Sequence, residues 1–369
     1  MKKALLLVSL VLLSASPAAA RILRVPVQYP TIQAAMTAAV SGDVVEVAAG
    51  VYDDATHPCT PTDTTKTVVI MKSGVTLRGE GRRATIIDAG HRGRGIYCEG
   101  LTSGIIENMT IRNAYNGSTV TIRGVEMTGN YDGAIIARLS STPTIQSCWI
   151  TNNQNKEGGG IFMDIQCGGL ISGCFITGNK APGGGGLYIR GSQPTIENCI
   201  VAADSVSVVA GNGGGITIES STVSMNSCIV DGCVATAAGG GLWIADSVVQ
   251  MNDCTVTNNV TTSSYGPGGG IMAEFNTDLT LTDCLIAGNE VFGNEPDSDG
   301  GGLRAVFATQ LSLTRCTVAA NSVAGALGAG ISAKYCTPTV DRCIIAYNGP
   351  GAGLYCQPDT DAAFTVPVT

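Results

Sequence analysis

One short pattern recurs along most of the chain: a cysteine, an aliphatic residue two positions later, and a polar residue five positions later. Successive cysteines of this pattern are 25 to 32 residues apart. They are Cys148, Cys174, Cys199, Cys228, Cys254, Cys284, Cys316 and Cys343. The residue five positions after the cysteine is Asn in six of the eight copies. Self-similarity at a period of this length indicates a repeat architecture.

Glycine clusters keep the same period. GGGI or GGGL begins at Gly158, Gly184, Gly213, Gly239, Gly268 and Gly300, and GAGI and GAGL follow at Gly328 and Gly351. Short β-prone runs such as "PTIQSC" and "WITNN" lie between the clusters, and helical spacing of apolar residues is confined to "TIQAAMTAAV". Units of this kind bury a continuous core only by stacking. The sequence therefore predicts an all-β protein, a parallel β-solenoid.

Stacking assigns a role to each position of the repeat. Equivalent residues of successive coils lie about one inter-strand spacing apart, roughly 4.8 Å. The Cys and the following aliphatic residue should point inward as apolar ladders. The Asn should adopt the left-handed backbone at a bend and hydrogen-bond its neighbours along the stack. The glycines supply turn conformations that β-branched residues do not adopt.

The chain resembles the right-handed parallel β-helix (pectin lyase-like) superfamily, typified by pectate lyases and pectin methylesterases. The stretches "YPTIQAAMTAAVSGDVVEVAAGVYDD" and "SGVTLRGEGRRATIIDAG" carry this resemblance. The glycine clusters with "ITNN" and "VTNN" also resemble the repeats of bacterial polymorphic outer-membrane proteins. The resemblance implies a right-handed β-helix whose N-terminal end is capped by a short helix from about Thr31 to Val40. It is specific for the fold and not for an activity.

The two ends of the chain carry separate expectations. A basic start, the apolar run "ALLLVSLVLL" and the small residues "SASPAAA" are typical of a secretory signal peptide. We therefore expect residues 1–20 to be removed and residues 21–369 to form one β-helix domain that is secreted or held at the cell surface. Only thirteen residues follow "GAGLYC". We therefore expect a chain that is incomplete at its C-terminus or an end covered by a partner.

The formal charge of −8 argues against nucleic acid or an anionic membrane as the main partner. No segment after the signal peptide is long and apolar enough to predict a membrane span. An acidic surface is compatible with neutral or cation-bridged glycans. We therefore expect an extracellular or cell-wall polysaccharide as partner, while the oligomeric state is not indicated.

Fourteen cysteines in an exported chain would ordinarily indicate disulfides. Stacked side chains point the same way and resist bridging, so we interpret the eight ladder cysteines as buried thiols that act as small hydrophobes. The better candidates for bridges lie off the ladder: Cys59, Cys98, Cys167, Cys233, Cys336 and Cys356. Zinc is disfavoured because the chain has two His and no Cys-x-x-Cys.

Two enzyme classes of the superfamily lack their key residues in this chain. "AAGVYDD" resembles the first motif of pectin methylesterases, but no "QDTL"-like segment follows it. His57 and His91 lack the Gly-His-Gly context of polygalacturonase-type hydrolases. The alternative that stays open is a calcium-dependent polysaccharide lyase acting on uronate-containing glycans, with Arg or Lys as the base.

Four successive coils place a charged residue immediately before the ladder cysteine: Asp253, Asp283, Arg315 and Arg342. Stacking would align them on one face, and they are the catalytic candidates of the lyase alternative. The favoured interpretation is a charge ladder whose opposite signs meet at Asp283 and Arg315.

A second acidic group, Glu295, Asp297 and Asp299, lies in "NEPDSDGGG" and supplies the candidate calcium ligands. The complete calcium-loop spacing is missing, so a solvated loop is favoured. Aromatic residues that could stack on sugar rings are few, and no periodic platform is expected from them: Tyr115, Tyr131, Trp149 and Trp243.

The fold alone does not select a function, because it hosts several activities and many proteins with none. The leading hypothesis is a non-catalytic surface or secreted scaffold, adhesin-like or glycan-contacting. The alternative is the polysaccharide lyase.

Overall fold

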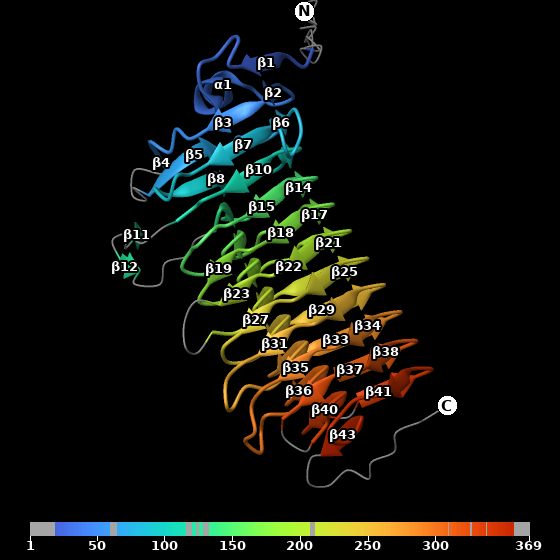
Figure 1. The fold of residues 1–369 in the computed structure, drawn as a ribbon. Helices are drawn as coiled ribbons and strands as arrows, with labels where there is room; N and C mark the ends of the chain where they lie inside the picture. Colours follow the sequence, from blue (N-terminus) through green and yellow to red (C-terminus); the bar gives the residue numbers. More distant parts are fainter. Residues whose placement is uncertain are drawn as a thin grey trace, which may run out of the picture.

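The computed structural model describes residues 19–59, 65–115, 120–122, 125–127, 133–206, 211–308, 310–324, 327–336 and 338–357. These residues wind into one column, with the first coils at one end and the last coils at the other (Figure 1). Successive coils add parallel strands to three long sheets, here named A, B and C, and a short strand to a fourth sheet, D. The predicted all-β parallel β-helix is confirmed. Residues 1–18 of the expected signal peptide and Tyr131 lie outside the described residues.

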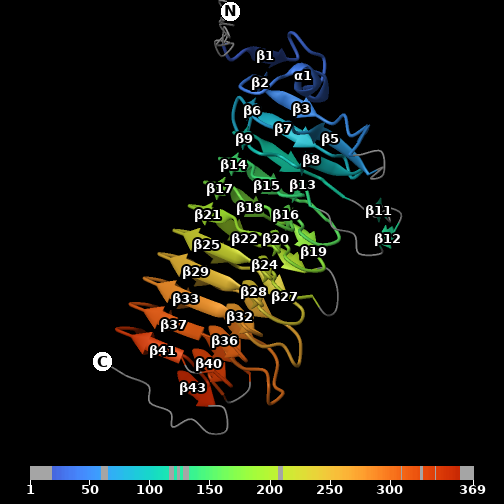
Figure 2. The same ribbon diagram turned by 180° about the vertical axis from the view of Figure 1, so that it is seen from behind.

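Each sheet collects one strand from successive coils, and seen from behind, the strands of sheet C lie one above another (Figure 2). Sheet A contains β1 (Ile22–Val25), β2 (Val44–Val47), β6 (Thr76–Gly79), β9 (Ile105–Glu107), β14 (Thr144–Gln146), β17 (Leu170–Ser172), β21 (Thr195–Glu197), β25 (Thr222–Asn226), β29 (Val248–Asn252), β33 (Asp278–Thr282), β37 (Gln310–Thr314) and β41 (Pro338–Asp341). Sheet B contains β3 (Gly50–Tyr52), β7 (Thr85–Asp88), β10 (Thr110–Arg112), β15 (Trp149–Thr151), β18 (Phe175–Thr177), β22 (Ile200–Ala202), β26 (Ile229–Asp231), β30 (Thr255–Thr257), β34 (Leu285–Ala287), β38 (Thr317–Ala319) and β42 (Ile344–Ala346). Sheet C contains β4 (His57–Pro58), β5 (Lys66–Ile70), β8 (Arg94–Glu99), β13 (Ile135–Arg138), β16 (Ile161–Asp164), β20 (Leu187–Arg190), β24 (Ile216–Glu219), β28 (Leu242–Ala245), β32 (Ile271–Glu274), β36 (Leu303–Val306), β40 (Ile331–Lys334) and β43 (Leu354–Gln357). Sheet D contains β19 (Lys180–Ala181), β23 (Ser205–Val206), β27 (Val234–Ala235), β31 (Val260–Thr261), β35 (Glu290–Val291) and β39 (Ser322–Val323). A separate antiparallel hairpin is formed by β11 (Val120–Ile122) and β12 (Val125–Met127).

The single helix among the described residues, α1 (Ile32–Ala38), lies at the N-terminal end of the column (Figure 1). It begins after Thr31, whose hydroxyl accepts a hydrogen bond from the Ala34 N–H at 3.1 Å, as expected of an N-cap. Its buried face contributes Ile32 and Met36 to the core. A capping helix is therefore present where the sequence predicted one, slightly shorter than Thr31 to Val40.

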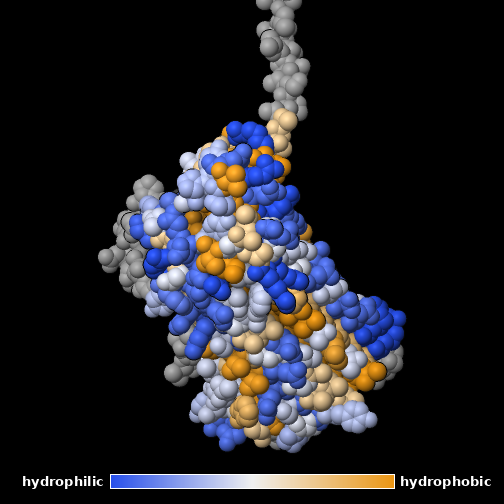
Figure 3. Space-filling model, turned by 45° about the horizontal axis from the view of Figure 1, so that its top comes forward, coloured by the Kyte–Doolittle hydropathy of each residue, from blue (hydrophilic) through white to orange (hydrophobic). Residues whose placement is uncertain are grey.

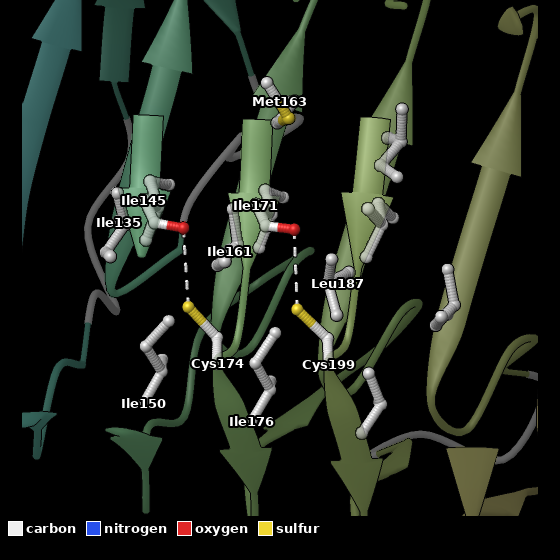
Figure 4. Packing of buried hydrophobic residues seen from close by; sticks show 14 of the residues in the cluster. Ile135, Ile145, Ile150, Ile161, Met163, Ile171, Cys174, Ile176, Leu187 and Cys199 are labelled. Carbon is white, nitrogen blue, oxygen red and sulfur yellow. Dashed lines mark hydrogen bonds between the residues drawn. The ribbon is translucent and has the colours of Figure 1, made fainter. Parts of the chain in front are cut away.

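The interior is filled by ladders of aliphatic residues and cysteines. The Sγ of Cys174 lies 3.5 Å from the carbonyl oxygen of Ile145, and Cys199 repeats this contact with Ile171 at 3.5 Å (Figure 4). Each thiol thus has an acceptor on the preceding coil while it packs among isoleucines. The ladder cysteines are buried thiols, as predicted, except that Cys343 in the last copy is only partly buried.

All fourteen cysteines are free, so the expectation that the off-ladder cysteines are the better bridge candidates is wrong. The reason is that these residues also fill packing positions. Cys98 occupies an inward position beside Ala137 of the next coil, and Cys233 occupies the position of the ladder asparagine.

The ladder asparagines hydrogen-bond along the stack, as predicted. Both the backbone N–H and the side-chain amide of Asn259 donate to the side-chain oxygen of Asn289, at 3.0 and 2.9 Å. The left-handed residue is not the ladder asparagine but the residue before it, such as Asn258 with φ 54°. The prediction for the bend was wrong by one position, because the ladder asparagine must point inward to reach its neighbours.

Candidate functional site

The outward residues of sheet C form a continuous stripe, which we call the polar face. Two outward positions of each strand alternate with buried aliphatic residues, so each position forms a ladder along the column. The first ladder contains Tyr97, Ile136, Phe162, Tyr188, Thr217, Trp243, Met272, Arg304 and Ser332. The second contains Glu99, Arg138, Asp164, Arg190, Glu219, Ala245, Glu274, Val306 and Lys334. Aromatic and charged side chains are therefore stacked along this face.

Two aromatic residues of the polar face donate to glutamates one coil further along. The hydroxyl of Tyr188 lies 2.6 Å from an oxygen of Glu219, and the indole N–H of Trp243 lies 3.0 Å from an oxygen of Glu274. Both arrangements run diagonally, from the first ladder to the second ladder of the next coil. The hydrogen bonds fix the ring orientations and leave other oxygen lone pairs of the carboxylates open to a ligand.

A cleft of about 210 Å³ opens at this part of the polar face. Its floor consists of Tyr188, Thr217, Glu219 and Trp243, which belong to three successive strands of sheet C. Its rim is formed by residues of the connections that precede β16, β20 and β24: Lys156, Glu157, Pro182, Gly183 and Asn212. Aromatic side chains, two carboxylates, an amide and an ammonium group thus line one cleft.

Beside the cleft, Asp164 lies between two guanidinium groups of neighbouring coils. Its oxygens are 2.6 Å from Arg190 and 3.5 Å from Arg138, and the three side chains are largely buried. The ring of Phe162 packs edge-on against Tyr188, with centroids 5.5 Å apart. These contacts hold the floor of the cleft rigid.

Burial and neighbouring charges decide which groups of the polar face can exchange protons. Burial, a hydrogen bond to Glu219 and the charge of that carboxylate all raise the pKa of Tyr188 above its ordinary value. Burial also raises the pKa of Glu274, although Trp243 and Arg304 act in the opposite direction. Tyr188 therefore keeps its proton at neutral pH and is a poor general base.

The four charged residues that precede ladder cysteines lie at the corner between sheets A and B and not on the polar face. All four have left-handed backbone, with φ between 50° and 54°. Arg315 pairs with Asp283 through two hydrogen bonds of 2.7 and 2.5 Å, with both side chains about half exposed. Arg342 pairs instead with Asp341 at 2.8 Å, and Asp253 accepts from Ser227 at 2.9 Å. The four side chains do not converge on one site.

The acidic group in "NEPDSDGGG" is divided between solvent and a buried ion-pair cluster. Asp299 is 1 % exposed and lies 2.9 Å from Arg304 and 2.8 Å from Lys334. Asp297 is exposed and pairs with the same ammonium group at 2.9 Å. The expectation of a fully solvated loop is therefore wrong for Asp299, because the basic residues of two later strands draw it inward.

Glu295 lies apart from this ion-pair cluster, and its carbonyl oxygen accepts from Ser298 N–H at 2.9 Å. Within the described residues, no group of three or more His, Cys, Asp or Glu side chains is arranged to hold a metal ion. Calcium binding by Glu295, Asp297 and Asp299 stays a prediction.

A periodic set of exposed aromatic residues was missed by the sequence analysis. Phe275, Phe307 and Tyr335 follow β32, β36 and β40, and the rings of Phe307 and Tyr335 stack with centroids 4.8 Å apart. Each lies seven positions after the first glycine of its cluster, a signal visible in the sequence. Phe307 is 55 % exposed and Tyr335 37 % exposed, so both rings remain partly accessible.

The described residues include no helix long and apolar enough to cross a membrane. The parallel sheets and the coil-by-coil register define a β-helix protein. The chain belongs to the family described as right handed beta helix region, whose model matches residues 63–201, 115–288 and 185–361. The resemblance of the repeats to polymorphic outer-membrane proteins stays a prediction.

Three solved structures share the general architecture at low similarity. The A-module of mannuronan C-5 epimerase AlgE6 from Azotobacter vinelandii is 14 % identical with a TM-score of 0.40, covering 89 % of this chain and 95 % of that one. The catalytic domain of a GH87 α-1,3-glucanase in complex with nigerose is 11 % identical with a TM-score of 0.42, covering 93 % and 69 %. ORF18 of Geobacillus virus E2 is 12 % identical with a TM-score of 0.36, covering 85 % and 55 %. Likeness at this level says nothing about the activity of the present chain. The curated proteins contain no match to it.

Proposed function

We propose that the protein is an exported, non-catalytic glycan-binding scaffold that holds a polysaccharide against the polar face of sheet C. The observation that carries the proposal is the cleft of about 210 Å³ in which Tyr188 and Trp243 flank Thr217. A sugar ring has apolar C–H faces and a rim of hydroxyl groups. Aromatic rings beside a few fixed polar groups are suited to both parts of such a ligand.

Export is part of the proposal and is supported by the signal-peptide pattern of residues 1–20. The stacked architecture supports a linear polymer as ligand. Positions on the polar face recur at each coil although their residues differ, so a chain of sugars lying along the column would meet the partly exposed Tyr188, Trp243 and Glu274 in succession. The cleft around Trp243 is the position on this face where aromatic and polar groups are both accessible.

Two titratable groups of the polar face are poor candidates for the base of a lyase. A lyase needs a base that releases its proton near neutral pH. Tyr188 has a raised pKa, for the reasons given above. Burial lowers the pKa of Lys334, but its hydrogen bonds to Asp299 and Asp297 outweigh this effect and the net shift is upward. Neither group is suited to take a proton from a substrate.

The proposal is tested by glycan-array binding of the purified chain and of its Trp243→Ala variant. Tyr347→Ala is the matched control, because Tyr347 is 94 % exposed and follows β42 of sheet B. We expect binding to at least one glycan class that is lost in Trp243→Ala and kept in Tyr347→Ala. Glu219→Gln, a variant of nearly the same shape, should weaken binding without altering the fold.

Circular dichroism of each variant separates a folding defect from lost binding. The proposal is overturned if no glycan binds the wild-type chain, or if folded Trp243→Ala and Glu219→Gln bind as the wild type does. Formation of unsaturated uronate products from a bound polysaccharide would establish the lyase alternative instead.

A further inference from the structure

A second cleft, of about 270 Å³, lies over sheet B, whereas the polar face belongs to sheet C. It is lined by Arg82, Arg83, Trp149 and Phe175. Trp149 and Phe175 begin β15 and β18 and are direct neighbours in the parallel register. The two arginines belong to the connection between β6 and β7. Figure 3 shows one face of the column, on which hydrophobic side chains lie next to strongly hydrophilic ones.

The position of the arginines is set by backbone contacts of their loop. The N–H groups of Ala84 and Thr85 both donate to the carbonyl oxygen of Gly81 at 2.9 Å, which closes a tight turn. The hydroxyl of Thr110, on the next coil, donates to the carbonyl oxygen of Arg82. The turn is thereby tied to the sheet, and the two side chains project over the aromatic residues of the following coils.

Arg82 and Phe175 are in direct cation–π contact. The guanidinium carbon of Arg82 lies 4.4 Å from the centroid of the Phe175 ring, which is 38 % exposed. Among the residues that the structure describes, no oxygen accepts a hydrogen bond from the Arg82 guanidinium. Arg83 is exposed and lines the same cleft.

Arg82 and Arg83 are exposed and have no acidic partner, whereas ten of the other eleven arginines of the described chain are ion-paired and the remaining one, Arg94, is buried. Ten others form an ion pair within 4.0 Å: Arg21, Arg24, Arg78, Arg92, Arg112, Arg138, Arg190, Arg304, Arg315 and Arg342. In the same described residues, neither Arg82 nor Arg83 has a carboxylate partner. A protein with a formal charge of −8 thus presents two adjacent, uncompensated guanidinium groups beside two aromatic rings.

We propose that this cleft is a second binding site that takes an acidic sugar, a ring that carries a carboxylate or a sulfate ester. The apolar face of the ring would pack on Trp149 and Phe175, and the anionic group would accept hydrogen bonds from Arg83 and Arg82. That the ligand is a sugar rests on the proposed function. That it is anionic rests on this cleft alone.

The two tryptophans allow the two sites to be tested separately, because the chain has only Trp149 and Trp243, one in each cleft. In the Trp243→Phe variant, fluorescence reports on the cleft of sheet B. Three oligosaccharides of equal length serve as ligands: one built from uronates, one bearing sulfate esters and one neutral. We expect saturable changes in Trp149 fluorescence with one or both acidic ligands, weakening as salt is added, and none with the neutral ligand.

Arg83→Ala in this background should weaken acidic-sugar binding roughly tenfold or more, as expected for the loss of a charge-assisted hydrogen bond. Arg315→Ala is the matched control, because it removes the same charge from an exposed position between sheets A and B many coils further along the column. The uronate and sulfate arms decide which anionic group is preferred. The inference is overturned if neither acidic ligand changes Trp149 fluorescence, if the neutral ligand binds equally well, or if Arg83→Ala binds as its parent does.

Failure of this inference is distinguishable from failure of the proposed function. The Trp149→Phe variant reports on Trp243 and hence on the polar face alone. A response of Trp243 without a response of Trp149 would overturn the second site and leave the proposed function standing. A response of Trp149 alone would support the acidic-sugar site and count against binding at the polar face.

Discussion

Asn179 donates two hydrogen bonds to the same carboxylate oxygen of Asp204, from its backbone N–H at 2.6 Å and from its side-chain amide at 3.0 Å. Asp204 therefore occupies a rung of the asparagine ladder. Its other carboxylate oxygen is buried and has no hydrogen-bond partner among the described residues. Burial raises the pKa of Asp204 well above its ordinary value, and the two hydrogen bonds from Asn179 offset this only in part.

This arrangement predicts a stability that falls as pH rises. A carboxyl group whose pKa is higher in the folded than in the unfolded state stabilises the folded state by its full amount only at pH values below its unfolded pKa of about 3.9. That contribution is lost at about 1.4 kcal/mol per pH unit as the pH rises toward the folded pKa. Asp204→Asn should remove this dependence and raise the free energy of unfolding at pH 7. Urea unfolding at pH 5 and pH 7 measures the difference.

The converse variant is Asn289→Asp, which places a carboxylate at another rung of the same ladder. Its free energy of unfolding should fall more steeply between pH 5 and pH 7 than that of the wild type, whereas that of Asp204→Asn should fall less. Equal pH dependence in the wild type and in Asp204→Asn would contradict the assignment.

The cysteines should remain unmodified in the native state. Burial raises the pKa of Cys98, which suppresses the reactive thiolate, and raises the pKa of the partly buried Cys356 to about 11. We expect alkylation of the native protein to be slow, to begin at the partly buried Cys343 and Cys356, and to reach all fourteen residues only after unfolding. Mass spectrometry of peptides from the native, non-reduced protein is the measurement. Disulfide-linked peptides would contradict the free-thiol structure.

The two acidic groups identified from the sequence should respond differently to neutralisation. Asp299→Asn leaves the buried Arg304 and Lys334 without their shared carboxylate and should cost about 3–5 kcal/mol of unfolding free energy. Asp283→Asn breaks an exposed pair with Arg315 and should leave the melting midpoint almost unchanged at physiological salt. Thermal unfolding of both variants provides the comparison. A larger loss of stability in Asp283→Asn than in Asp299→Asn would contradict the finding that Asp299 is the buried carboxylate and Asp283 the exposed one.

The glycine clusters should be intolerant of a single added methyl group. A Cβ at Gly240 would lie 2.3 Å from the carbonyl oxygen of Gly269 on the next coil, so Gly240→Ala should destabilise by roughly 1–3 kcal/mol. A Cβ at Gly81 would have nothing within 4 Å, and Gly81→Ala serves as the control. Equal stability of the two variants would argue against the close stacking of coils at the clusters.

The fold could be predicted from the sequence because each rung of the solenoid repeats the same local pattern. The alignment of Cys148 with Cys174 already gives the register in which Trp149–Thr151 pairs with Phe175–Thr177. The pairing of Asp283 with Arg315 followed from the same alignment and is observed.

The polar face could not be predicted in the same way. Its outward residues change from coil to coil, so the sequence offers no repeated signal for the contact between Tyr188 and Glu219. Trp149 and Trp243 are both aromatic candidates of the sequence, but nothing in their spacing placed them in different sheets, B and C. The contact of Arg82 with Phe175 depends on how one connection folds over later coils, which a linear pattern does not encode.

The central claim is that the polar face binds a glycan without altering it. Its most direct test is a titration of the Trp149→Phe variant, in which Trp243 is the only tryptophan, with a glycan that the wild-type chain binds on an array. We predict a saturable change in Trp243 fluorescence and recovery of the glycan with its length and mass unchanged. A flat fluorescence signal, or a glycan recovered shortened or unsaturated, would contradict the account.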